Sequence, residues 1–400
     1  MITSTQTWKK VKFADFVDTN PKSPLKKNNK YPFIPMELVD GVSKNPTSFY
    51  TKKFTGGGSR FSNGDTVFAK ITPCLENGKI AQIKDLPDGI GFGSTEFFVF
   101  RSKEGISDKD FVYYLSRTDD IRSPAIKSMI GASGRQRADK SVVENLDVLA
   151  PSITDQRRIS DVLSAYDDLI ENNARRIKIL EQMAQAIYTE WFVNFHFPDY
   201  EKVKIIDSGT DFGKIPEGWR IGKLSDLANI TMGQSPSSDF YNESGDGLPF
   251  HQGVTNFGFR FPTTVNFSTG GTRRANAGDV LFSVRAPVGR INVADRNMII
   301  GRGLSAMRST SESQSYLLCT LKNLFTTEDL IGGGAIFASV TRADLNNFPV
   351  VIPDAKVISF FEELISPFDG LIFDISRNLS VLRHSRDLLL PKLVTGEIRV

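Results

Sequence analysis

Cations and small polar residues gather in a few glycine-containing segments of this chain. Residues 131–137 (GASGRQR) and 70–79 (KITPCLENGK) are the two such segments in the first half, and most cations of residues 216–352 are arginines. A guanidinium group binds phosphate or guanine through two parallel hydrogen bonds, and glycine lets the backbone approach a ligand closely. The candidate residues for nucleic-acid binding are Lys70, Thr72, Asn77, Lys79, Ser133, Gly134, Arg135, Gln136, Arg137, Arg273, Arg274, Arg285, Arg290 and Arg302.

These segments also have a purely structural interpretation. Their glycines are typical of turns, and the Ile71-Thr72-Pro73 sequence is also typical of the end of a strand. Bound DNA requires polar side chains on a scaffold that admits the duplex, with further contacts to phosphate that fix the register. The sequence alone leaves both interpretations open for each cation.

Residue patterns for catalysis are missing from the sequence. The histidines His196, His251 and His384 are scattered without metal-ligand spacing, and Asp354 is better explained as a helix cap than as part of a nuclease motif. The chain has no GxxxxGK[ST] phosphate-binding loop and no Asp/Asn-Pro-Pro-aromatic motif of an adenine amino-methyltransferase. The glycine runs 56–58 and 332–334 lack the context of a dinucleotide site. The sequence therefore predicts a binding protein with no catalytic residue and no metal site.

Composition places the chain among soluble globular proteins. It has 400 residues, of which 40% are hydrophobic, and a net charge of +3, so more than one domain is expected. No apolar run approaches the roughly 20 residues that span a bilayer, and the first residues (MITSTQTWKK) do not resemble a signal peptide. Cys74 and Cys319 are far apart, which argues against disulfides and favours the reducing cytoplasm.

An internal repeat is the strongest signal for how these residues are positioned. The nine residues from Trp8 (WKKVKFADF) recur from Trp219 (WRIGKLSDL), and the segment 64–68 (GDTVF) recurs as 278–282 (GDVLF). A repeat of about 200 residues predicts two copies of one structural unit. Each copy has short apolar runs between glycines, asparagines and serines, which favours strands.

Each copy ends in a long predicted helix that carries an apolar stripe with alternating spacings of four and three residues. Such a stripe is the contact line, or seam, of a coiled coil. The first seam comprises Ile159, Leu163, Tyr166, Ile170, Asn173, Ile177, Leu180, Ala184, Ile187 and Trp191. The second, 202 positions later throughout, comprises Phe361, Ile365, Phe368, Ile372, Ile375, Leu379, Leu382, Arg386, Leu389 and Leu393.

The two helices are expected to pair with each other and to run antiparallel, because two copies of one unit then close a pseudo-twofold structure. Ser152 and Asp354 are the predicted N-caps. The first helix is expected to stop by Pro198, and the second is expected to stop or kink near Pro391. Asn173 and Arg386 interrupt the seam. A polar group there favours a role in fixing the register, and contact with a partner subunit is the alternative.

The predicted fold class is α+β, with two repeated globular domains separated by two long helices that pair as an antiparallel coiled coil. The predicted parts are a first globular domain at 1–151, a long helix at 152–197, a polar linker at 198–215, a second globular domain at 216–352 and a second long helix at 353–400.

The sequence resembles the specificity subunits of type I restriction–modification enzymes over almost its full length. Residues 185–198 (QAIYTEWFVNFHFP) resemble the central conserved region of that family, and 389–398 (LLPKLVTGEI) resemble its C-terminal signature. Residues 68–79 resemble one version of the family's target-recognition domain. Residues 283–289, followed by 300–303, resemble another.

The resemblance implies a non-catalytic subunit that binds double-stranded DNA. Each domain would recognise one part of a split, asymmetric target, and the helices would set the length of the spacer between the parts. Two methyltransferase subunits that use S-adenosylmethionine would methylate one adenine in each part. Two restriction subunits driven by ATP and Mg²⁺ would join for cleavage, so the cofactors would belong to the partners and none to this chain.

Two alternatives remain open at the level of sequence. One is an orphan or methylation-only specificity subunit, which sequence does not separate from the first interpretation. The other is a coiled-coil scaffold whose globular domains bind proteins, and which would show no salt-dependent affinity for DNA. A fused methyltransferase is disfavoured by the missing amino-methyltransferase motif.

Overall fold

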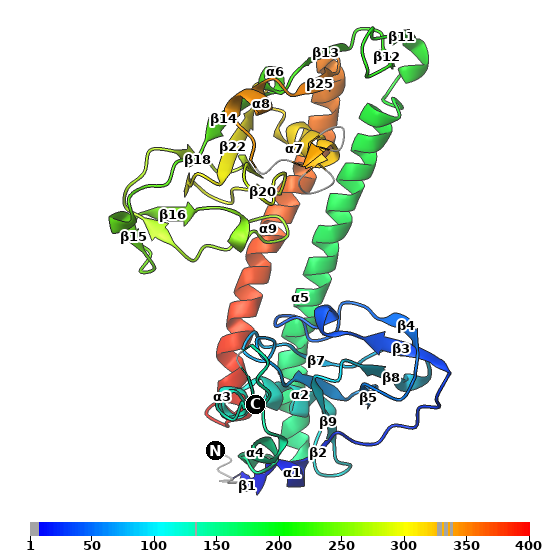
Figure 1. Cartoon of the computed structure of the whole chain (residues 1–400), viewed down its shortest axis with the longest axis vertical. Helices are drawn as coiled ribbons and strands as arrows, with labels where there is room; N and C mark the ends of the chain where they lie inside the picture. The colour runs from blue at the N-terminus through cyan, green and yellow to red at the C-terminus, as the bar shows by residue number, and fades with distance from the viewer. Residues whose placement is uncertain (1–7, 133, 326–329, 332–334, 337–338) are drawn as a thin grey trace. The chain divides into compact units, whose positions relative to one another are not determined.

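The computed structural model describes residues 8–132, 134–325, 330–331, 335–336 and 339–400. The chain forms two compact units, one of Met1–Arg175 with Arg377–Val400 and one of Arg176–Ser376. Each unit combines a globular domain with one segment of each of two long helices (Figure 1). The predicted α+β class with two domains and two long helices is confirmed.

The first domain is built on an antiparallel sheet whose side chains enter two different cores. Strand side chains alternate between the two faces of a sheet. Phe68 and Phe98 therefore pack towards α2 (Lys109–Arg117), whereas Val67 and Val99 pack on the other face. Both faces are covered, which explains the continuous apolar runs in the sequence. The strands, in sheet order, are β2 (Val17–Thr19), β9 (Phe97–Ser102), β6 (Thr66–Ala69) and β7 (Ile80–Gln82).

A second sheet covers the far face of the first. Its Ile34 and Phe61 share a core with Val67 and Ala81 of the first sheet. In sheet order its strands are β4 (Tyr50–Lys53), β3 (Lys30–Ile34), β8 (Ile90–Gly93) and β5 (Ser59–Ser62), and β3 runs parallel to β8. The other elements of the domain are β1 (Lys9–Lys12), α1 (Phe13–Phe16), α3 (Asp119–Lys127), α4 (Lys140–Glu144) and β10 (Asp147–Ala150), with β1 antiparallel to β10.

The second domain repeats this architecture. Its first sheet has the equivalent strand order β14 (Ala228–Met232), β22 (Leu304–Ser309), β19 (Val280–Ser283) and β20 (Ile291–Val293). Its second sheet has the order β15 (Tyr241–Asn242), β17 (Phe267–Ser268), β16 (Leu248–His251), β21 (Met298–Ile300) and β18 (Arg274–Ala275), again with a parallel pair, β16 and β21. The remaining elements are β13 (Arg220–Lys223), α6 (Leu224–Leu227), α7 (Gln314–Leu324), β23 (Leu330–Ile331), β24 (Ala335–Ile336), α8 (Arg342–Asn346) and β25 (Pro349–Ile352).

The repeated Gly-Asp pair stands at the same turn in both domains. Asp65 accepts hydrogen bonds from the Ser62 backbone N–H (2.7 Å) and from Arg101 (2.6 and 2.7 Å). Asp279 likewise accepts from the Asn276 backbone N–H (2.7 Å) and from Arg308 (2.6 Å). Each aspartate thus closes the turn before the central strand and fixes it to the next strand of the sheet.

The long helices are α5 (Ile153–Tyr188) and α9 (Ala355–Val394). The Ser152 hydroxyl accepts a hydrogen bond from the Asp155 N–H (3.1 Å), and Asp354 accepts one from the Lys356 N–H (2.8 Å), so both predicted N-caps are confirmed. A single π-helical turn, Thr189–Val193, follows α5. Helix α9 continues through Pro391 for three more residues.

The predicted seam residues are all buried or half-buried. In the first unit, Ile159 and Leu163 of α5 share a core with Leu390 and Leu393 of α9. In the second unit, the rings of Tyr188 and Phe361 lie 6.0 Å apart. Early residues of one helix therefore meet late residues of the other, and the segments in each unit run in opposite directions (Figure 1). The antiparallel pairing is confirmed.

The segment 198–215, predicted as a linker, has a structure of its own. It contains a 3₁₀ turn (Tyr200–Lys202) and a hairpin of β11 (Ile205–Asp207) with β12 (Lys214–Pro216). Glycines at 209 and 213 adopt positive φ, which lets the chain reverse within six residues. Among the described residues, no helix is long and apolar enough to cross a membrane.

Candidate nucleic-acid interface

The two candidate segments of the first domain lie side by side. The Thr72 N–H donates to the Gln136 carbonyl (3.0 Å), and the Ala138 N–H donates to the Lys70 carbonyl (2.8 Å). Ile71 and Arg137 form a bridge of the antiparallel type. Segments that the sequence marked separately thus form one surface at the end of β6.

Arg137 is the most strongly held candidate cation of this surface. Its guanidinium group makes two hydrogen bonds of 2.7 and 2.8 Å to the Glu96 carboxylate. The hydrogen bonding by Arg137 lowers the pKa of Glu96, against burial, which raises it; the charges of Arg137 and Lys70 lower it further. A phosphate that binds Arg137 must compete with this carboxylate. Glu96 lies outside the segments that the sequence marks as candidates.

Two other candidates already serve the fold. The Lys79 ammonium group donates to the Met36 carbonyl (2.9 Å), and the Thr72 hydroxyl donates to Glu76 (2.9 Å). Asn77 is exposed, as are Gly134 and Arg135, and Gln136 is half-buried. Ser133 lies outside the described residues.

A basic cleft of about 300 Å³ lies between the two sheets of the first domain. Its cations are Lys22, Arg60 and Lys70, of which only Lys70 was a candidate from sequence. Arg60 lies over the Phe54 ring (4.9 Å) and Lys70 over the Phe98 ring (5.4 Å), so aromatic faces hold both cations in place. The Gly-Ser-Arg sequence at 58–60 was the available signal, because it matches the composition of the other candidate loops.

The second domain presents its arginines at the same place in the fold. The Val284 N–H donates to the Gly303 carbonyl (2.9 Å), just as the Lys70 N–H donates to the Glu96 carbonyl (2.9 Å). Arg285 bridges to Ser339 as Ile71 bridges to Arg137. Val284 and Gly303 therefore occupy the positions of Lys70 and Glu96.

The candidate arginines of the second domain lie close together along the backbone. Arg285 follows Val284, Arg302 precedes Gly303, and the Arg273 carbonyl accepts a hydrogen bond from the Ile300 N–H (3.1 Å). The exposed candidates are Arg273, Arg274, Arg285, Arg290 and Arg302.

The acidic residue of the first domain has no counterpart here, because glycine replaces Glu96. Within the described ranges, no carboxylate lies within ion-pair distance of Arg285 or Arg302. Among the described residues, a carboxylate therefore holds a cation of this surface in the first domain, and none pairs with Arg285 or Arg302 in the second.

The histidines do not build a catalytic centre. His251 is buried in β16, and burial lowers its pKa, so the imidazole is neutral at pH 7. His196 pairs with Glu190 at 3.0 Å on the surface. In the described part of the chain, no three His, Cys, Asp or Glu side chains are placed to hold a metal.

Both repeats of the chain match one family of known proteins. The family model described as "Type I restriction modification DNA specificity domain" matches residues 5–182 and 216–374, once in each repeat. A putative type I restriction enzyme MjaX specificity subunit from Methanocaldococcus jannaschii is 27% identical over 84% of this chain and 79% of its own length. The type I restriction enzyme HindI specificity subunit from Haemophilus influenzae is 24% identical over 84% of this chain and 86% of its own.

A solved structure shares the fold. The crystal structure of a type I restriction–modification system S subunit from M. genitalium aligns over 98% of both chains with a TM-score of 0.57 and 15% identity. At this identity, the similarity bears on the fold alone.

Proposed function

This chain belongs to the type I restriction–modification DNA specificity family, and we propose that each of its two domains recognises one half of a split, asymmetric DNA target. DNA recognition is the role of the family. The division between the domains is supported by one observation. Equivalent surfaces carry different chemistry, with Lys70 and Glu96 in the first domain where Val284 and Gly303 stand in the second. Different donors and acceptors at one place favour different base pairs.

The candidate residues divide into two sets under this proposal. Arg285 and Arg302 of the second domain contact phosphate or guanine directly. In the first domain Lys70, together with Arg60, supplies charge from the basic cleft, and Arg137 contributes when DNA displaces its guanidinium group from Glu96. Backbone contacts fix the register, and base-edge contacts give the sequence preference.

Catalysis and cofactors belong to partner subunits in this proposal. The chain itself is non-catalytic and acts in the cytoplasm, bound to two methyltransferase subunits that hold S-adenosylmethionine. Two restriction subunits that use ATP and Mg²⁺ join the complex for cleavage. The relatives named above are called specificity subunits, which agrees with this division of labour.

Exposed apolar residues on the helices support two copies of one partner. Leu169 and Val381 are exposed in the first unit, at 52% and 64%. Leu371 and Ile179 occupy the positions 202 residues away in the repeat, and they are exposed in the second unit at 41% and 46%. Large apolar side chains at repeat-related exposed positions favour two identical contacts with a partner.

Methylation mapping of a genome tests the proposed function. Cells that carry this gene with its methyltransferase partner are compared with cells that lack only this gene. We expect modified adenines in one split, asymmetric motif, which disappear without the chain. Identical maps would contradict the proposal and favour a scaffold. A methylation-only system would give the motif without restricting unmodified phage DNA.

A further inference from the structure

Each domain has a loop that runs from the recognition surface to the long helices. In the first domain the loop is residues 35–47, after β3, and in the second it is 252–265, after β16. Both loops start beside the same feature, because the Ser94 N–H donates to the Ile34 carbonyl (3.2 Å) and the Gly301 N–H donates to the His251 carbonyl (2.8 Å). The two loops are therefore equivalent, although their sequences do not align.

One cation occupies the same position in both loops. The Gln82 N–H, at the end of β7, donates to the Lys44 carbonyl (2.8 Å). The Val293 N–H, at the end of β20, donates to the Arg260 carbonyl (2.9 Å). Since β7 and β20 are repeat equivalents, Lys44 and Arg260 are equivalent residues. We call them the loop cations.

Arg260 fastens its loop to both long helices. Its side chain is only 8% exposed, and its guanidinium group pairs with Glu181 of α5 (2.8 Å) and with Asp369 of α9. Lys322 of α7 pairs with the same Glu181. Two carboxylates from two helices thus converge on one loop residue, with its charge compensated as burial requires.

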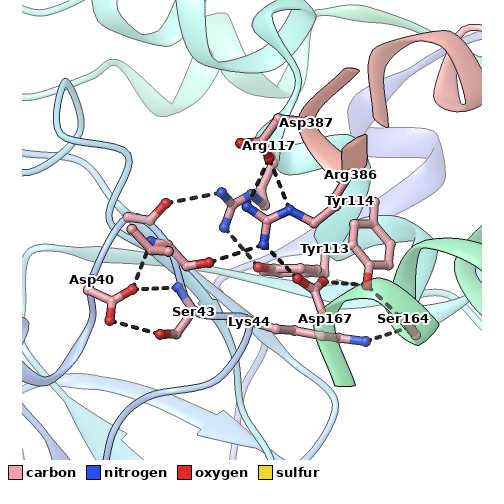
Figure 2. A network of polar contacts seen from close by, with 12 residues as sticks. Asp40, Ser43, Lys44, Tyr113, Tyr114, Arg117, Ser164, Asp167, Arg386 and Asp387 are labelled. Atoms are coloured by element: carbon pink, nitrogen blue, oxygen red, sulfur yellow. Dashed lines mark hydrogen bonds and ion pairs between the residues drawn. The ribbon is translucent and has the colours of Figure 1, made fainter. Parts of the chain in front are cut away.

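In the first domain, different groups attach the equivalent loop to both long helices (Figure 2). The Lys44 ammonium group donates to Ser164 of α5 (2.9 Å). It also donates to Asp110 (2.9 Å). The Val42 carbonyl of the same loop accepts from Arg386 of α9 (3.2 Å). Although burial raises the pKa of Asp110, the Lys44 and Lys109 ammonium groups hold it below its usual value. This loop is also tied to both helices.

The same loops hold the candidate DNA-binding segments. In the second domain, the Gln252 carbonyl accepts from the Gly303 N–H (3.1 Å), next to Arg302. In the first domain, the Met36 carbonyl accepts from Lys79 (2.9 Å). Each loop is therefore bonded to the long helices near its loop cation and to a candidate DNA-binding segment near its start.

We propose that Lys44 and Arg260 are positioning residues for DNA recognition, each fixing the recognition surface of its own domain against the helix pair. Neither needs to touch DNA. Recognition depends on placing side chains to within a fraction of an ångström, so a loosened loop costs discrimination between sequences. The inference rests on the proposed assignment of one half-target to each domain.

The test uses the complex of the full chain with its methyltransferase partner, on DNA carrying the target found by methylation mapping. Affinity is measured for the target and for targets with one base pair changed in either half. Arg260→Ala is expected to reduce the ratio of the two affinities, intact target over altered target, about tenfold. This reduction should occur only when the changed base pair lies in the half assigned to the second domain. Lys44→Ala is expected to do so for the other half. Lys202→Ala, which removes an exposed cation from a surface pair, should change neither ratio.

A double variant separates positioning from stability. Ala184 stands 202 residues before Arg386, so the repeat places it opposite Asp369 as Arg386 stands opposite Asp167. Ala184→Arg combined with Arg260→Ala supplies the guanidinium group from the helix and leaves the loop untied. We expect the melting temperature lost in Arg260→Ala to return, while discrimination between targets stays low.

Arg260→Lys keeps the charge but cannot bridge two carboxylates, and it replaces the double variant if that variant does not fold. It should show a smaller loss of discrimination, confined to the same half of the target.

Three outcomes would overturn the inference. The first is an affinity ratio between intact and altered targets that stays unchanged in Lys44→Ala and Arg260→Ala. The second is a ratio that falls equally for both halves in either variant. The third is full recovery of discrimination in the double variant. If the unmodified complex itself shows no dependence on one of the halves, the proposed function fails instead.

Discussion

Single side chains distinguish the two candidate DNA-binding surfaces. Arg137 makes a two-point ion pair with Glu96, whereas Arg285 has no carboxylate within ion-pair distance among the described residues. To bind a phosphate, Arg137 must exchange one anion for another, and the exchange returns little net free energy. No carboxylate of the described residues has to be displaced from Arg285. The two arginines are therefore expected to contribute unequally to affinity for DNA.

We predict that Arg285→Ala weakens DNA binding by the assembled methyltransferase more than Arg137→Ala does. A phosphate contact by Arg285 would lower the slope of log affinity against log salt by about one unit. Titrations at several salt concentrations measure both quantities. Arg220→Ala, which removes an exposed arginine paired with Asp226, is the matched control.

Glu96→Gln provides the complementary variant. It removes the negative charge and one of the two acceptors that hold the Arg137 guanidinium group. Arg137→Ala should therefore cost more affinity in this background than in the unmodified chain. An Arg285→Ala variant with unchanged affinity and unchanged slope would remove that residue from the interface.

The sequence predicted the position of these loops but not the state of their side chains. Composition marked Arg137 and Lys79 as candidates. The structure shows that Glu96 and the Met36 carbonyl already bind them. Both partners are distant in sequence and follow no motif, so they become visible only when β9 and the loop after β3 are placed. Lys22 follows no motif either, whereas the Gly-Ser-Arg sequence at 58–60 could have marked Arg60.

At the scale of elements, heptad spacing was the most informative pattern. It located both seams, because a four-three period is visible without any partner. It did not find the partner of Arg386, since Asp167 lies one residue after the seam residue Tyr166. Asp167 and Arg386 meet at 2.6 Å and are almost fully buried, and Tyr114 donates to the second oxygen of Asp167 (2.7 Å; Figure 2). The pair favours the interpretation that Arg386 fixes the register.

Short elements were the least predictable. The polar residues around Ile205 and Ile206 predict a linker, whereas the structure has the hairpin of β11 and β12 there. The second sheets of both domains contain strands of two to five residues, too short for an alternation pattern to identify. Their order follows from contacts between distant segments, which local sequence does not encode.

We predict that Arg386→Ala destabilises the first unit by about 3–5 kcal/mol, because it leaves the Asp167 carboxylate buried without a cation. Asp167→Ala combined with Arg386→Ala should recover a large part of this loss. Denaturant unfolding of the full chain, followed by a probe in the first unit, measures the difference. Lys392→Ala on the same helix removes an exposed pair with Glu397 and should change stability by less than about 1 kcal/mol. An Arg386→Ala variant as stable as this control would contradict a structural role for the pair.

At the scale of the whole molecule, the repeat combines domain surfaces that differ with helix positions that are the same. Equivalent positions of the two candidate surfaces differ, as Glu96 and Gly303 do, yet the long helices repeat two exposed apolar positions, Leu169 with Leu371 and Ile179 with Val381. Different side chains at equivalent positions suit a target with two unlike halves. Repeated apolar positions suit a complex with two copies of one partner, since identical subunits require identical contact surfaces.

This symmetry predicts that each exposed pair on the helices binds one methyltransferase subunit. Leu169→Asp and Leu371→Asp, at repeat-related positions, should each reduce the complex from two methyltransferase copies to one, and the double variant should bind none. Burying a carboxylate without a partner costs more than the apolar contact contributes, so one substitution is sufficient to release a copy. Native mass spectrometry of the purified complexes gives the copy number directly. Ile205→Asp, at an exposed apolar residue of the β11–β12 hairpin, is the control and should retain both copies. Two copies on both single variants would show that the partner binds elsewhere. Loss of both copies from either variant would show that the two contacts are not independent.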